Sequence, residues 1–150
     1  MKKSTLLMVA VATLTACSDN LSSLQEKAGR SATSFAEAYF NYDYVRANEL
    51  ITPESEKWIR YAATNTSQED LDMLNTRSEA ASVELLDCEQ INDTTCEVLL
   101  QVDDYLAIDS IGRPGEFRSG DEFRLKTVLR DGKWQVRMEG LPRSEKHSRD

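Results

Sequence analysis

The residues that could do acid-base chemistry gather in one run, Asp103-Asp104-Tyr105. Two carboxylates and a phenol are groups that can serve as a general base and a proton donor. Adjacent acids in a long strand can also mark a β-bulge or bend, and we favour that interpretation over a paired acid and base. The single histidine, His147, falls in the polar stretch 143–150, where a solvated side chain is expected. We therefore assign no catalytic residue from the sequence.

No ligand spacing in the sequence predicts a metal site or a bound cofactor. There is no histidine pair, Cys-x-x-Cys or calcium-loop pattern, and no glycine-rich loop that would hold phosphates. The 150 residues, 40% hydrophobic and 29% charged, are typical of one globular domain. The net charge of -8 comes from acidic residues before residue 100, and no basic stripe follows. Nucleic acid is therefore not an expected partner.

The start of the chain predicts export and a membrane anchor. Lys2 and Lys3 precede an apolar run, 6–14, that is too short to span a bilayer as a structural helix. The next residues, Leu14-Thr15-Ala16-Cys17, resemble the lipobox of bacterial lipoproteins. That resemblance implies removal of signal peptide 1–16 and lipid on Cys17, anchored in the cell envelope at the periplasmic face of the outer membrane or the cell surface. A secreted protein with an incidental Cys17 is the alternative.

Two further cysteines, Cys88 and Cys96, form an even pair in a chain expected to be exported. They lie symmetrically about Asn92, so a hairpin turning there would set them directly opposite each other, at a distance that a disulfide can bridge. The short loop would contribute about 2.5 kcal/mol to stability. Two buried free thiols are the alternative.

Four helices are predicted in the first half of the domain. Ser23-Leu24-Gln25-Glu26 has the form of a capping box, and apolar residues then recur at helical spacing as far as Tyr39. Gly29 weakens this helix by about 1 kcal/mol relative to alanine. Asn41-Tyr42-Asp43 breaks the pattern, with Asn41 suited to a left-handed backbone and Asp43 to capping a second helix.

A third helix is predicted to begin at Thr52-Pro53, and a short fourth one at Ser67. From Ala81 onward, apolar residues alternate with polar ones, which predicts antiparallel strands with one dry face. The predicted turns are Asn92-Asp93, 112–115 and Asp131-Gly132. Helices followed by such strands predict an α+β domain, with three to four N-terminal helices on a four- to five-stranded sheet.

The chain at this point resembles the nuclear transport factor 2-like superfamily, also called cystatin-like or SnoaL-like, and within it small bacterial lipoproteins of uncharacterised function. The segments 40–44, 50–54 and 129–136 carry the resemblance, which spans about residues 24–141. It implies a strongly bent, cone-shaped sheet around the first helix, with an open end that holds a ligand or a partner. Residues 17–23 would then be a flexible tether and 142–150 a polar tail.

Enzymes of this superfamily use a pocket Asp, or an Asp-His pair, with a tyrosine donor. The position of the isomerase's helix-one tyrosine falls on Phe35, which has no hydroxyl, so the resemblance gives little support to that chemistry. Aromatic residues at helical spacing are usually core packing. The residues that remain for a pocket are Tyr39, Tyr42, Trp58, Tyr61, Asp103 and Tyr105.

Three functions follow from these expectations, in order of preference. The first is a non-enzymatic, lipid-anchored envelope protein that binds a small hydrophobic ligand in the cone or an envelope protein on the sheet. The second is a lipoprotein enzyme of isomerase or dehydratase type, with Asp103 or Asp104 as its base. The third is an accessory subunit of a membrane assembly that uses the acidic helical surface.

Overall fold

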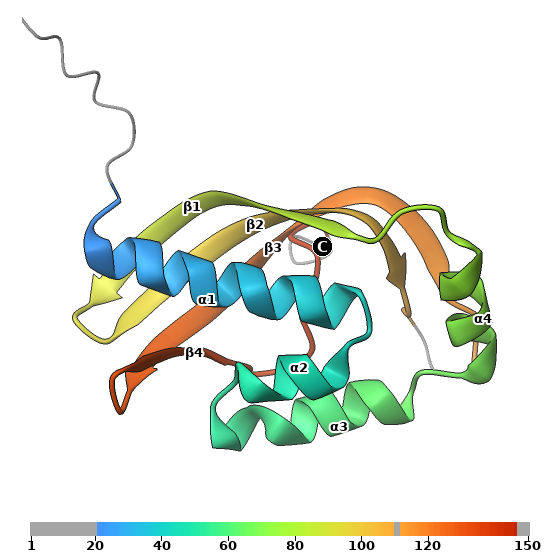
Figure 1. The fold of residues 1–150 in the computed structure, drawn as a ribbon, viewed down its shortest axis with the longest axis horizontal. Helices are drawn as coiled ribbons and strands as arrows, with labels where there is room; N and C mark the ends of the chain where they lie inside the picture. The colour runs from blue at the N-terminus through green and yellow to red at the C-terminus, as the bar shows by residue number, and fades with distance from the viewer. Residues whose placement is uncertain (1–20, 110–111, 147–150) are drawn as a thin grey trace, which may run out of the picture.

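Helix α1 (Ser23–Phe40) lies along one face of a four-stranded antiparallel sheet, which curves around it (Figure 1). The computed structural model describes residues 21–109 and 112–146. Three further α-helices and one turn of 3-10 helix follow α1, and all of them precede the strands. The predicted α+β class, with helices packed on one antiparallel sheet, is confirmed.

Helix α1 begins one residue earlier than predicted. Ser22, not Ser23, is the N-cap, because its hydroxyl accepts a hydrogen bond from Gln25 N (3.2 Å) and the Gln25 side chain accepts one from Ser22 N (2.9 Å). Gly29 is buried against strand β1 (Ser82–Asn92), where an added Cβ would lie 3.0 Å from Leu85 Cδ2. The residue that weakens the isolated helix therefore permits its close approach to the sheet.

A sharp corner joins α1 to helix α2 (Tyr44–Glu49). Tyr42 takes the left-handed backbone conformation, with φ of 63°, which the sequence had assigned to Asn41. The Asn41 side chain instead accepts a hydrogen bond from Ala81 N (2.9 Å) and donates one to Ala81 O (3.1 Å), which ties the corner to the chain entering β1. Asp43 caps α2 as predicted, by accepting from Arg46 N (3.1 Å).

The chain after α2 runs beside strand β4 (Lys133–Arg137) before it turns into the next helices. Thr52 N donates to Val136 O (3.0 Å), and Val136 N donates to Leu50 O (2.9 Å). The 3-10 helix η1 (Pro53–Ser55) then leads directly into helix α3 (Glu56–Thr64). The predicted third helix therefore begins from a backbone that is already paired with the sheet.

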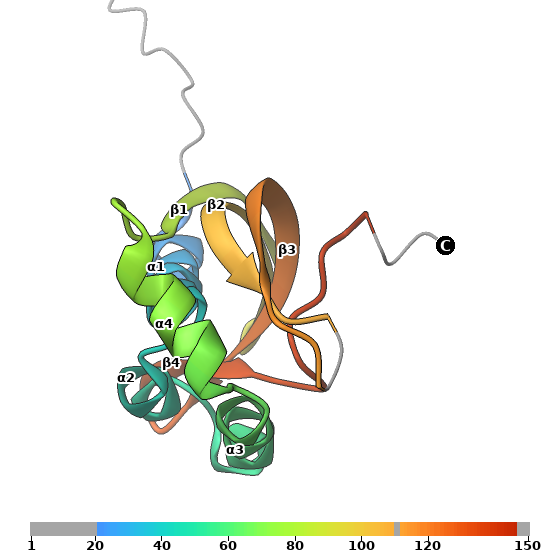
Figure 2. The same cartoon turned by 90° about the vertical axis from the view of Figure 1, so that its right-hand side faces the viewer.

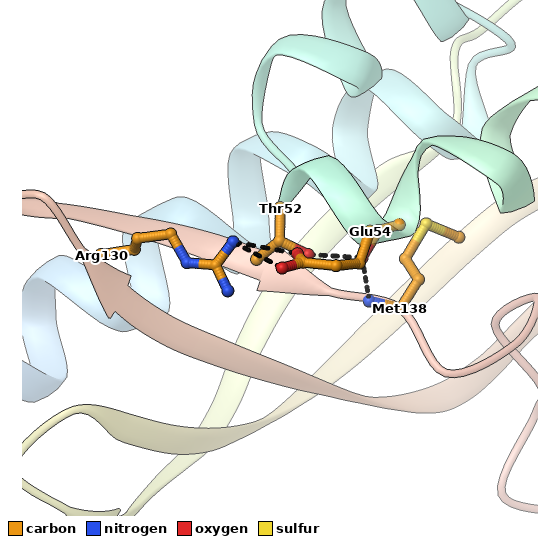
Figure 3. Close-up of polar contacts among 5 residues, drawn as sticks. Thr52, Glu54, Arg130 and Met138 are labelled. Carbon is orange, nitrogen blue, oxygen red and sulfur yellow. Dashed lines mark hydrogen bonds and ion pairs between the residues drawn. The ribbon is translucent and has the colours of Figure 1, made fainter.

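Side-chain contacts fix this helix start on the strands (Figure 3). Thr52 makes no side-chain capping bond, and its hydroxyl lies 2.7 Å from Ser55 Oγ, with both residues fully buried. Ser55 Oγ also accepts a hydrogen bond from Met138 N (2.8 Å). On the exposed side of these buried contacts, Arg130 Nη1 donates to both carboxylate oxygens of Glu54, at 2.8 and 2.9 Å.

Helix α4 (Gln68–Thr76) is held by polar contacts more than by apolar packing, since Asp70 is its only buried residue. Ser67 caps the helix as predicted, and the Asp70 carboxylate completes the capping box by accepting a hydrogen bond from Ser67 N (2.8 Å). The other Asp70 oxygen accepts from Gly115 N (2.8 Å), just before strand β3 (Glu116–Arg130). Figure 2 shows α4 in front of the sheet, above α3.

The sheet has the strand order β1-β2-β3-β4, with strand β2 (Thr95–Ala107) between β1 and β3. All three neighbouring pairs are antiparallel. The β3–β4 hairpin turns at Asp131 and Gly132, whose φ angles are 52° and 77°, as the sequence predicts. Alternate residues of β2 and β3 point toward α1 and form the core with it. Phe35 of α1 packs in this core with Val98, Leu100 and Val102 of β2 and Phe123 and Leu125 of β3.

The two cysteines of the first hairpin are not directly opposite each other, so that prediction is wrong. Cys88 pairs with Val98, and Cys96 pairs with Gln90. The turn is centred one residue later than expected, and β1 carries register shifts on both sides of Cys88. Both cysteines are buried, and in their free-thiol form burial, with the Cys96 thiol beside it, raises the pKa of Cys88 to about 12. A bridge between them stays a prediction from the sequence.

The described domain extends past residue 141, where the sequence placed its end. Ser144 is buried and pairs with Phe123, and Glu145 N donates to Glu122 O (2.9 Å). Of the expected tether 17–23, Leu21 already packs against the core. Signal peptide 1–16, lipid attachment at Cys17 and the position of His147 lie outside the described residues. Among residues 21–109 and 112–146, no helix has the length and apolar character needed to cross a membrane.

Candidate functional site

All five tyrosines of the chain line one cleft of about 1230 Å³. They are Tyr39, Tyr42, Tyr44, Tyr61 and Tyr105, and Trp58 lies among them. The helices form one wall of this cleft, and β2, β3 and the segment 136–145 form the other. Tyrosine and tryptophan carry large apolar faces with a polar tip, so they suit surfaces where apolar groups meet water.

The helical wall is positioned by the corner between α1 and α2. Tyr39 lies one turn after Phe35 on α1, and their rings stack with centroids 5.6 Å apart. The left-handed conformation of Tyr42 turns the chain so that Tyr44, the first residue of α2, packs against both Tyr39 (5.8 Å) and Tyr42 (5.6 Å). A helix end and a tight turn thus place three tyrosines together.

Three of the five tyrosine hydroxyls have partners within the protein. Tyr42 Oη donates to Leu106 O (2.8 Å), Tyr44 Oη lies 3.3 Å from Thr66 Oγ1, and Tyr105 Oη donates to Asp121 Oδ2 (2.5 Å). Tyr39 and Tyr61 make no hydrogen bond through their hydroxyls to any described residue. Both of these hydroxyls therefore remain available to a ligand.

Tyr105 and Asp121 form a buried hydrogen bond in which the phenol is the donor. Burial raises the pKa of Tyr105, and the bond to Asp121 raises it further. Burial alone would raise the pKa of Asp121, but hydrogen bonds from Tyr105 and Lys146 lower it below its ordinary value. Lys146 Nζ lies 3.1 Å from Asp121 Oδ1. The proton therefore stays on Tyr105, and Asp121 stays ionised.

The carboxylates that line the cleft are paired with cations. Arg118 pairs with Asp109, Lys126 Nζ lies 3.2 Å from Glu139, and Arg124 lies 3.9 Å from Glu97 and 3.5 Å from Glu145. Among the described residues, no three His, Cys, Asp or Glu side chains gather as metal ligands. The cleft therefore offers aromatic faces, hydroxyl groups and positively charged side chains.

Five of the six residues predicted for a pocket, Tyr39, Tyr42, Trp58, Tyr61 and Tyr105, line this cleft. Asp103 does not. It lies across from Gly120, where an added Cβ would approach its Oδ1 to 2.3 Å, and it accepts a hydrogen bond from Gln101 (2.8 Å). The alternation of β2 breaks at Asp104, whose φ is 55°: Val102 is buried, Asp104 is exposed, and Tyr105 is buried in its place. The predicted bend is present, and it directs the tyrosine, not the acids, into the interior.

Sequence reasoning missed Tyr44, Arg118 and Asp121. A signal for Asp121 was present, because it shares the inward spacing of Phe123, Leu125 and Thr127 on β3, where an acid must find a partner. Nothing in the local sequence around Arg118 marks it, since it joins the cleft through pairing of β3 with Tyr105 of β2.

No protein-family model matches the sequence, and no curated protein matches it either. Several solved structures are similar to it at low sequence identity. A nuclear transport factor 2-like protein of unknown function from Shewanella oneidensis MR-1 is 11% identical, with a TM-score of 0.47 over 74% of this chain and 92% of that one. A ketosteroid isomerase-like protein from Erwinia carotovora atroseptica SCRI1043 is 11% identical, with a TM-score of 0.49 over 78% of this chain and 94% of that one.

A third similar structure is a nuclear transport factor 2-like protein involved in plasmid conjugation. It is 14% identical, with a TM-score of 0.41 over 81% of this chain. The match takes in 49% of that protein, so this chain spans about half of its length.

Proposed function

We propose that this protein is a lipid-anchored component of a bacterial cell envelope that binds a small, largely hydrophobic ligand in its aromatic cleft and catalyses no reaction on it. The observation that carries the proposal is the gathering of all five tyrosines and Trp58 around one cleft. Ligand sites are concave and mostly apolar, with a few polar groups that orient the ligand. The free hydroxyls of Tyr39 and Tyr61 supply such groups.

A protein partner on the sheet has less support than a ligand. The large hydrophobic side chains that are exposed are spread over five elements: Val45 on α2, Tyr61 on α3, Leu71 on α4, Leu86 and Ile91 on β1, and Phe117 on β3. Hydrophobic residues exposed singly in this way are ordinary on soluble proteins. They do not favour a docking surface over the cleft.

An isomerase or dehydratase activity based on Asp103 or Asp104 has less support than ligand binding. Asp103 lies outside the cleft, and Asp104 is exposed beside it. The acids that do line the cleft are engaged by Arg or Lys. A general base must reach the proton that it removes, so neither aspartate suits that role.

The anchor at Cys17 is supported by the positive start, the apolar run and the sequence Leu14-Thr15-Ala16-Cys17. More than one acyl chain would make the attachment durable. Mass spectrometry of the mature N-terminus is the test, and we expect a chain that begins at a lipid-modified Cys17. A mature chain with an unmodified Cys17, or one cleaved elsewhere, would overturn the anchor.

The ligand site is tested with an uncharged fluorescent probe, N-phenyl-1-naphthylamine, on residues 18–150 prepared without lipid. This chain contains the whole described core, and the absence of acyl chains and detergent keeps the probe from partitioning into them. We expect saturable binding seen as a rise in probe emission. A variant Tyr61→Ala should bind about two- to twelvefold more weakly, since an aromatic contact contributes roughly 0.5–1.5 kcal/mol.

The matched control is Phe117→Ala, which removes an aromatic ring outside the cleft. The two rings are exposed to similar extents, 45% for Tyr61 and 41% for Phe117. The control should bind the probe like the wild type. Binding that does not saturate, or equal losses in the two variants, would contradict a ligand site in the cleft.

A further inference from the structure

The charged groups around the cleft differ from those of the whole chain. The chain has a formal net charge of -8, yet the cleft lining holds more cations than anions. The cations are Arg118, Arg124, Lys126, Arg137 and Arg143, and the anions are Glu97, Asp109, Glu139 and Glu145. Arg137 and Arg143 form no ion pair with any described residue. An acidic protein thus presents a locally positive cleft, which attracts anions.

Arg118 has the least exposed side chain among the cations that form ion pairs at the cleft. Its side chain is 22% exposed, against 61% for its partner Asp109. It lies opposite Tyr105 in the register of β2 and β3, within the same cleft as the tyrosines. Burial lowers the pKa of Arg118, but Asp109 and Tyr105 together raise it above its ordinary value, so the guanidinium stays charged. The carboxylate of Asp109 is therefore exposed while the guanidinium that it contacts is sheltered. A ligand carboxylate or sulfonate could take the place of the Asp109 carboxylate on Arg118.

A run of rings connects Arg118 to the free hydroxyl of Tyr39. The Tyr105 ring lies 5.3 Å from that of Phe40, and the Phe40 ring lies 5.2 Å from that of Tyr39. Burial raises the pKa of Tyr39, so its hydroxyl remains a hydrogen-bond donor over the whole physiological range. The cleft thus has a cation and a neutral donor separated by aromatic surface.

We infer that the ligand of this cleft is an amphipathic organic anion, with a flat apolar body against the tyrosines and an anionic oxygen group that takes the place of Asp109 on Arg118. The inference rests on the proposed function and names the chemical class of its ligand. Aromatic clusters also bind ammonium groups. Here the excess of positive charge around the cleft and the sheltered Arg118 favour the anion.

Two probes that differ by one charged group separate this inference from the proposed function. 8-Anilinonaphthalene-1-sulfonate is the anionic counterpart of the uncharged N-phenyl-1-naphthylamine, with the same ring system. Both are titrated into residues 18–150, and the measured quantity is the ratio of their dissociation constants. Binding of neither probe would overturn the proposed function. If both probes bind but no cleft variant alters the ratio of their dissociation constants, only the inference that the ligand is an anion would be overturned.

Arg118 and Asp109 should shift that ratio in opposite directions. Arg118→Gln should weaken binding of the anionic probe about tenfold and leave the neutral probe within about twofold, because a hydrogen bond to a charged group is lost. Asp109→Asn should strengthen binding of the anionic probe by about threefold, because Arg118 loses its competing carboxylate. If the pair were only structural, both variants would act in the same direction and on both probes alike, which would overturn the inference.

The matched control for Arg118 is Arg60→Gln, the same change at an exposed arginine that also pairs with a carboxylate but does not line the cleft. Its effect on the anionic probe should stay within about twofold, because exposed charges are screened by salt and solvent. An equal loss in Arg60→Gln and Arg118→Gln would show general attraction of anions and would overturn the assignment to Arg118. Circular dichroism and cooperative urea unfolding of each variant test whether it folds like the wild type.

Discussion

Asp70 holds helix α4 in place, and replacing it with alanine should release that helix from the domain. Its carboxylate accepts hydrogen bonds from Ser67 N (2.8 Å), Ser67 Oγ (2.7 Å) and Gly115 N (2.8 Å), and its side chain is 1% exposed. No other residue of α4 is buried. The helix therefore has little apolar contact with which to compensate for the loss.

The magnitude follows from the bonds that are lost. Asp70→Ala removes half of the capping box, worth about 1 kcal/mol. It also leaves the buried Gly115 N–H without a partner, which costs roughly 1–3 kcal/mol. The local opening of α4 should thus become easier by about 2–4 kcal/mol, or roughly 30- to 700-fold.

Hydrogen exchange measured by mass spectrometry is the assay, because it reports local opening separately from global unfolding. Amides of 68–76 should exchange faster by this factor, up to the rate of unprotected amides, while those of β2 and β3 change little. Asp72→Ala is the control, since Asp72 is an exposed acid on the same helix that bonds only Gln68 (2.9 Å) among the described residues. An increase below about threefold in Asp70→Ala, or an equal one in Asp72→Ala, would refute the reasoning.

The same carboxylate gives the stability of α4 a pH dependence with a defined sign. Hydrogen bonds from Ser67 and Gly115 lower the pKa of Asp70 below its ordinary value of 3.8, against the opposite effect of burial. A group whose pKa falls on folding stabilises the native state above its unfolded pKa and loses this effect as pH falls through the folded value. The difference in α4 exchange between wild type and Asp70→Asn, corrected for the intrinsic rate, should therefore be constant above about pH 5 and shrink below pH 3.8. A constant difference down to pH 2 would contradict this assignment.

Two further predictions concern buried polar groups. Tyr105→Phe should lower the free energy of unfolding, measured in urea, by about 1–3 kcal/mol, because Asp121 keeps its contact with Lys146 but loses its shortest hydrogen bond. Tyr61→Phe is the control. Equal effects of the two variants would contradict a specific role for the Tyr105 hydroxyl. In the folded, reduced protein, iodoacetamide at pH 8 should label Cys88 far more slowly than in protein unfolded with urea, because the folded thiol is buried and its pKa is raised to about 12. Equal labelling rates in the two states would show that the thiol is accessible in the folded protein.

The sequence by itself determined the order and type of the elements. Caps at Asp43 and Ser67, the alternation of apolar residues along the strands and the Asp131-Gly132 turn each depend on neighbours within a few positions, so local chemistry was enough. The same locality identified the break at residues 41–43 and the bend at Asp103-Asp104. It could not say which residue would take the left-handed conformation, because Asn41 was drawn into hydrogen bonds with Ala81, forty positions away.

Only the tertiary structure decided which residues share the cleft. The pairing of Tyr105 with Arg118 and the offset between Cys88 and Cys96 depend on strand register, and the bond from Gly115 N to Asp70 depends on where β3 meets α4. A one-residue displacement in a strand moves every side chain to the other face, and short-range patterns do not fix such a displacement at a bulge. For that reason the sequence predicted the aromatic residues of the site, while only the fold showed that Arg118 belongs to the site and that Asp103 does not.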